Sequence, residues 1–129
     1  MTKERLETYI SVKEEIKELK ARIETLSEET TVHSVINDYR TGFPVPQSIV
    51  GVDDRRYQRL YQNYTEKIKE LEHECKEIED YIEQIPDSLT RRIFRMYYID
   101  GIKQEKIARK LHIDQSRVSR KIHDFLKNA

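Results

Sequence analysis

Near the C-terminus, a short segment carries several side chains that can read nucleic-acid bases. Gln can pair bidentately with adenine and Arg with guanine, whereas Ser can donate to several base edges or to phosphate. A helix over residues 115–126 places these side chains together on its outward face. They are Gln115, Ser116, Arg117, Ser119 and Arg120. The pattern predicts that this helix enters the major groove of double-stranded DNA.

The elements that must position these side chains are two short helices joined by a tight turn, over residues 103–126. His112 and Ile113 make the turn, and the Ile113 side chain is expected to pack between the two helices. Asp114 is a good N-cap residue for the second helix. The side chains expected to be buried are Ile107, Ala108 and Leu111 in the first helix and Val118, Ile122, Phe125 and Leu126 in the second. This is the spacing of a DNA-binding helix-turn-helix.

An alternative interpretation is that any two amphipathic helices joined by a short turn look like this, with a solvated polar face. Three coincident features favour DNA binding: the small Ala108 where the helices cross, Ile113 in the turn, and the base-reading face. One position departs from the usual pattern, because His112 stands where such motifs carry Gly. We expect a positive φ there, which costs a residue other than Gly some free energy.

The residues upstream extend the pattern. A helix begins at Asp87 and is stopped by Asp100-Gly101. The segment SLTRRIFRMYYIDGIKQEKIARKLHIDQSRVSRKI resembles the C-terminal promoter-binding region of bacterial sigma factors. It is equally similar to the tail of the small ArpU- or RinA-type late regulators encoded by phages of Gram-positive bacteria. The resemblance implies that Gln115, Ser116, Arg117, Ser119 and Arg120 face the groove and that Lys103 and Gln104 meet phosphate. Nothing resembles the sigma regions that bind core polymerase tightly or melt the promoter, so a complete sigma factor is not expected.

The formal net charge of zero conceals a division between two parts of the chain. Residues 90–129 hold 11 Lys and Arg against 4 Asp and Glu, a net charge of +7. The other 89 residues hold 13 against 20, a net charge of −7. A basic segment that coincides with the two short helices is the electrostatic footprint expected of a DNA-binding face. The acidic part is expected to assemble the protein rather than to bind DNA.

Two long helices are predicted in the acidic part, over residues 3–28 and 53–85. Each carries apolar residues at alternating spacings of three and four, as in a coiled-coil seam. A segment over residues 29–52, punctuated by Gly and Pro, separates them, with a short helical piece possible from Val32 to Tyr39. The seam residues are Tyr9, Val12, Ile16, Leu19, Ile23 and Leu26 in the first helix and Tyr57, Tyr61, Tyr64, Ile68, Leu71, Cys75, Ile78, Ile82 and Ile85 in the second.

These two helices most simply form an antiparallel hairpin. Two helices bury little apolar surface, so we expect the hairpin to pair with another copy in a homo-oligomer. The tyrosines on the seam are expected in the core rather than as a stacking platform for single-stranded nucleic acid.

Other classes of protein find little support in the sequence. The single Cys75 excludes an intramolecular disulfide and fits a reducing cytoplasm. No apolar run reaches the length of a membrane span, and the charged N-terminus does not look like a signal peptide. No convergent set of metal ligands, no phosphate-binding loop and no nucleophile motif is visible, so neither a cofactor nor enzymatic activity is expected.

The sequence therefore predicts an all-α, cytoplasmic protein with two parts. Residues 1–86 form a coiled-coil hairpin for oligomerisation, and residues 87–129 a sigma-like helix-turn-helix domain that binds DNA. The predicted function is sequence-specific regulation of transcription, from a phage or prophage genome as the resemblance implies. Two alternatives stay open: the small DNA-recognition subunit of a phage terminase, and an adaptor that contacts RNA polymerase or another protein without reading DNA.

Overall fold

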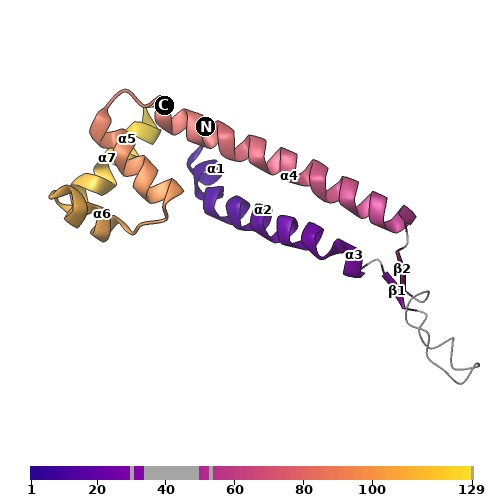
Figure 1. Ribbon diagram of the computed structural model, residues 1–129. Coiled ribbons are helices and arrows are strands. Elements are labelled where there is room, and N and C mark those ends of the chain that lie inside the picture. Colours follow the sequence, from indigo (N-terminus) through magenta and orange to yellow (C-terminus); the bar gives the residue numbers. More distant parts are fainter. Residues whose placement is uncertain (30, 34–49, 53, 129) are drawn as a thin grey trace, which may run out of the picture. The chain divides into compact units, whose positions relative to one another are not determined.

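The computed structural model describes residues 1–29, 31–33, 50–52 and 54–128 (Figure 1). The chain is all-α, as predicted, and its one β element in the described residues is a pair of three-residue strands. The elements are α1 (Lys3–Glu7), α2 (Tyr9–Glu24), α3 (Leu26–Glu29), β1 (Thr31–His33), β2 (Val50–Val52), α4 (Asp54–Glu83), α5 (Ser88–Phe94), the π-helical turn η2 (Arg95–Ile99), α6 (Gln104–Leu111) and α7 (Gln115–Lys127).

The chain forms two compact units. We call Met1–Glu15 together with Leu71–Ala129 the terminal unit, and Ile16–Glu70 the middle unit. The limits of the units fall inside the long helices α2 and α4, so each helix contributes to both. The predicted domain boundary after residue 86, and the coiled-coil character of the hairpin, stay predictions.

In the middle unit, the last part of α2 and the first part of α4 run antiparallel and are connected through β1 and β2 (Figure 1). The strands pair antiparallel, with Thr31 opposite Val52 and His33 opposite Val50. The helical piece considered for residues 32–39 is therefore wrong at its first two positions, which lie in β1. The remainder of that piece, and most of the predicted irregular loop, lie outside the described residues.

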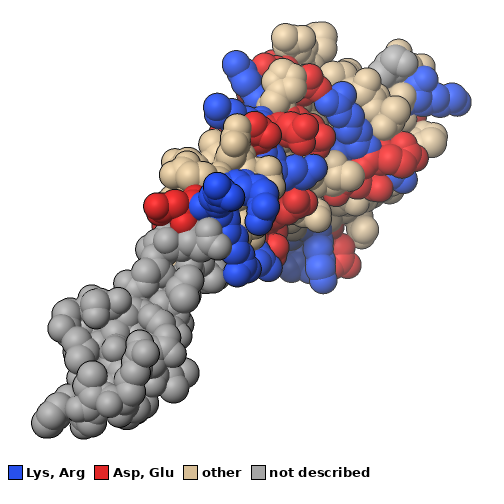
Figure 2. All heavy atoms as spheres, turned by 90° about the vertical axis from the view of Figure 1, so that its right-hand side faces the viewer, with Lys and Arg blue, Asp and Glu red and all other residues tan. Residues whose placement is uncertain are grey.

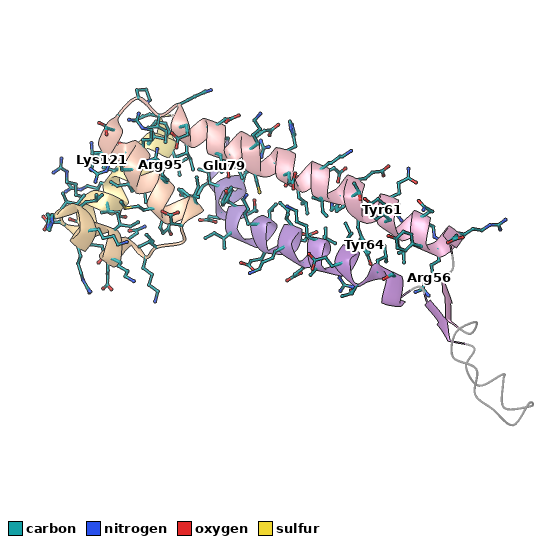
Figure 3. The ribbon with its side chains drawn as sticks, in the orientation of Figure 1. Arg56, Tyr61, Tyr64, Glu79, Arg95 and Lys121 are labelled. Atoms are coloured by element: carbon teal, nitrogen blue, oxygen red, sulfur yellow. The ribbon has the colours of Figure 1, made fainter. Side chains whose placement is uncertain are left out.

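The tyrosines of the middle unit differ from the prediction. Tyr57 and Tyr64 are half-buried, but Tyr61, labelled in Figure 3, is 43% exposed. The Tyr61 ring stacks on that of Tyr57, with centroids 6.0 Å apart and an interplanar angle of 13°. Placing Tyr61 in the core was wrong. A step of three residues from Tyr57 leads to the half-buried Leu60, whereas a step of four turns Tyr61 toward solvent. With one partner helix, only a narrow stripe of α4 is covered.

The terminal unit holds most of the core. The end of α4 and the residues just after it are buried at spacings of three and four, as the seam predicted: Leu71, Cys75, Ile78 and Ile82 on the helix and Ile85 beyond it are all 5% exposed or less. Against them pack Leu6, which is 1% exposed, and Tyr9, which is 3% exposed. The Tyr9 hydroxyl donates to the Glu79 carboxylate. The N-terminal segment therefore contacts the end of α4 through both apolar side chains and a hydrogen bond.

Helix α5 begins where the sequence predicted. The Asp87 carboxylate accepts hydrogen bonds from the Thr90 backbone N–H (3.1 Å) and the Thr90 hydroxyl (2.6 Å). These bonds, and then the charge of Lys121, lower the pKa of Asp87. The helix continues into η2 and stops before Gly101, whose φ of +69° favours glycine. Tyr98 is buried and Tyr97 is half-buried.

Candidate nucleic-acid interface

The turn between α6 and α7 is built by backbone hydrogen bonds. Ile113 N–H donates to the Ala108 carbonyl at 3.0 Å, and His112 N–H donates to the Arg109 carbonyl at 3.4 Å. This pair of bonds is a Schellman motif, which places His112 in the left-handed region with φ 57°. In the described part of the chain, His112 alone among residues other than Gly has a positive φ. The turn thus adopts the conformation expected from the sequence without the usual glycine.

The inward face of α7 is fixed by the core. Val118 is fully buried and Ile122 is 6% exposed. Phe125, at the far end, is half-buried and meets the ring of Phe94 edge-on, with centroids 5.2 Å apart. On α6, Ile107 and Ala108 are buried, as predicted. With Val118 and Ile122 held inward, the opposite side of α7 must face solvent.

The predicted site residues lie on that outward face and at the start of α6. Lys103 is exposed just before α6, and Gln104 is half-buried at its first position. Arg120 Nε donates to the Ser116 carbonyl at 3.3 Å, which holds its guanidinium along the helix. Five of the predicted residues are exposed on α7: Gln115, Ser116, Arg117, Ser119 and Arg120.

Two clefts flank α7, and four of these residues line them. The first, of about 510 Å³, is lined by Arg117 and Arg120. The second, of about 480 Å³, is lined by Gln104 and Ser119. The structure therefore brings the two arginines together on one side of α7, and Ser119 together with the start of α6 on the other.

The first cleft adds a basic residue that the sequence analysis missed. Lys121 lines it, and Lys121 Nζ lies 3.6 Å from the Asp87 carboxylate. Figure 3 labels Lys121 on the ribbon. Its position directly after Arg120 could have indicated a role in the site. The helical periodicity, however, predicts that residue 121 lies toward the buried side of the helix. Asp87 and Asp124 also line this cleft, so its positive charge is partly balanced.

The N-terminus of α7 has no side-chain cap. Asp114 occupies the N-cap position, but its side chain makes no capping hydrogen bond, in contrast to the capping expected from its residue type. The first N–H groups of a helix have no partner within the helix. With the positive end of the helix dipole, these groups favour an anion such as a phosphate. The exposed side chains of Gln115 and Ser116 lie at the same end.

Charges of both signs cover one face of the protein. On the face shown in Figure 2, Lys and Arg are interspersed with Asp and Glu. Such mixing is typical of solvated helical surfaces and points to no ligand. The excess of basic residues in the last 40 positions, a net +7, is spread over α5, η2, α6 and α7. A net positive charge there favours association with the DNA backbone.

Comparisons with protein-family models, with curated proteins and with solved structures find no match. Among the described residues, no helix combines the length and apolar character needed to cross a membrane. The same residues include no group of three or more His, Cys, Asp or Glu placed to hold a metal ion.

Proposed function

We propose that this chain is a sequence-specific DNA-binding regulator of transcription, with α7 as the recognition helix in the major groove. One observation carries the proposal. The buried Val118 and Ile122 orient α7 so that its exposed face presents Arg117 and Arg120 next to an uncapped helix N-terminus. Arg reads guanine through two hydrogen bonds, and the exposed Gln and Ser side chains beside it suit adenine and phosphate.

The start of α6 would anchor the protein on the DNA backbone. Lys103 is exposed at the N-cap position, and Gln104 opens the helix. In a helix-turn-helix, the first helix crosses the backbone while the second lies in the groove. Contacts of Lys103 and Gln104 with phosphate would set the register, and the side chains of α7 would set the sequence preference.

A second copy of the chain would complete the binding unit. In the middle unit, the apolar residues Leu19, Ile23, Leu60 and Tyr64 are half-buried. Another copy would cover these residues and the exposed ring of Tyr61. A symmetric oligomer would present two recognition helices to two half-sites, as paired or repeated operators require. Light scattering on the purified protein should give the mass of a dimer or larger assembly, and a pure monomer at micromolar concentration would contradict this part.

The regulatory role can be tested with promoter fragments. As the resemblance implies, a phage or prophage genome and its bacterial host would supply the target promoters. Fluorescence anisotropy across a salt series should show tight binding to a subset of the fragments and weaker binding to the others. Because each released counterion contributes about one unit to the salt slope, the slope counts phosphate contacts.

Three results would contradict the proposal. Weak and equal binding to every fragment would show that the protein does not recognise a specific DNA sequence. Absence of DNA binding, with co-purification of RNA polymerase after nuclease treatment, would identify an adaptor protein instead. Ring-shaped oligomers bound at a packaging site rather than at promoters would identify a terminase subunit.

A further inference from the structure

The cleft beside Ser119 is lined by four elements of the terminal unit. Lys3 comes from α1 and Tyr97 from η2, whereas Gln104 opens α6 and Leu126 lies near the end of α7. Its volume of about 480 Å³ falls in the range of small-molecule sites, which span roughly 300–1,000 Å³. A solvated crevice between two helices would not gather side chains from four separate elements.

The lining combines an apolar part with an unsatisfied polar group. Ile122, Leu126 and Tyr97 supply apolar surface. Tyr98, which is 3% exposed, also lines the cleft, and its buried hydroxyl has no hydrogen-bond partner among the described residues. Burial, followed by the nearby Tyr97 and Glu7, raises the pKa of Tyr98 to about 12, so the hydroxyl stays protonated and can donate. An unpaired buried donor costs free energy. The Tyr98 hydroxyl is closed off from solvent, so a ligand acceptor would recover this cost after a shift of the Tyr98 ring.

The charges at the cleft favour an anion. Lys3 and Lys127 both line it, and Glu7 is its single acidic residue. The Glu7 carboxylate already lies 3.8 Å from Lys3 Nζ. That ion pair offsets the negative charge of Glu7 and leaves Lys127 to attract an anionic group.

We propose that this cleft binds a small organic anion with an aromatic or branched apolar body, and that the bound molecule keeps DNA from Gln104 and Ser119. The apolar body would lie against Tyr97, Ile122 and Leu126. The anionic group would face Lys127 and accept a hydrogen bond from Tyr98. The effect on DNA rests on the proposed function, because Gln104 and Ser119 line the cleft and also belong to the proposed DNA interface. The protein would then be a regulator whose DNA binding responds to a metabolite.

The first experiment measures binding of the fluorescent probe anilinonaphthalene sulfonate, an aromatic anion, to the full chain without DNA. Lys127→Glu and Gln104→Glu each place a carboxylate at the cleft, and Lys110→Glu makes the charge change of Lys127→Glu at an exposed residue of α6 outside it. In both cleft variants the affinity for the probe should fall by roughly fivefold or more, whereas Lys110→Glu should change this affinity by less than about twofold. Circular dichroism verifies that each variant is folded. Equal probe affinity in all four proteins would overturn the ligand site.

The second experiment adds saturating probe to the wild-type protein bound to its preferred promoter fragment. The apparent dissociation constant for DNA should rise at least about fivefold, because the two ligands share Gln104 and Ser119. An unchanged DNA affinity at saturating probe would overturn the competition. If the protein without probe binds no DNA, the proposed function fails, but the probe titration still decides the ligand site on its own.

Discussion

Replacing Leu6 tests whether the first helix belongs to the core of the terminal unit. Leu6 is 1% exposed, and a Leu→Ala change at such a position costs about 2–5 kcal/mol through lost burial and the cavity left behind. With a urea dependence of about 2 kcal/mol per M, a loss of roughly 3 kcal/mol lowers the unfolding midpoint by about 1.5 M. Circular dichroism and tyrosine fluorescence both report this transition, since the chain has eight Tyr and no Trp.

Ile10 provides the matched control. It lies four residues further along the same N-terminal segment but is 43% exposed, so Ile10→Ala should cost less than about 1 kcal/mol. A Leu6→Ala variant that unfolds at the same urea concentration as Ile10→Ala would refute the reasoning. It would show that residues 1–15 contribute little to the terminal unit.

Three further predictions concern single side chains of the terminal unit. Asp87→Ala should destabilise the protein near neutral pH by removing the α5 cap. Because folding lowers the pKa of Asp87, its stabilisation is present above the unfolded pKa and is lost as the pH falls through the folded pKa. Urea titrations of both proteins should therefore converge toward acidic pH, and a pH-independent difference would contradict this assignment. His112→Val should lower the free energy of unfolding by about 1–2 kcal/mol, since a β-branched residue resists φ 57°, whereas His112→Gly should cause no loss; equal urea midpoints for these two variants would argue against strain at the turn. Tyr81→Phe should leave thermal stability unchanged or raise it, because the buried Tyr81 hydroxyl has no partner in the described residues; a drop in the melting temperature would indicate a hydrogen bond that the structure does not show.

The helical architecture of this chain was largely accessible from its sequence. The apolar spacing from Ile68 to Ile85 matches the buried residues of the α4 end, and Asp87 begins α5. These features are local, because residue type and helical periodicity decide them. The left-handed turn at His112 was also accessible, since its position between two amphipathic helices determines the backbone conformation.

The sequence analysis missed features that depend on how separate helices pack together. Leu6 lies three residues before Tyr9 and extends the same stripe, but its burial requires the terminal unit to pack against α1. Tyr61 is exposed although its spacing predicts burial. A single partner helix covers too narrow a stripe of α4 to bury it. The second cleft joins residues from α1, η2, α6 and α7, and no spacing rule relates positions so far apart in sequence.

The most direct test of the central claim compares Arg117→Ala and Arg120→Ala with Lys69→Ala, which removes one positive charge from an exposed position on α4. Each protein is titrated with its preferred promoter fragment and with a scrambled fragment at one salt concentration. If the two arginines read guanine, each change should cost about 1–3 kcal/mol on the preferred fragment and much less on the scrambled one, whereas Lys69→Ala should change neither. Equal weakening on both fragments would show that the arginines contact only phosphate. Unchanged binding to both fragments would show that this face of α7 does not meet DNA.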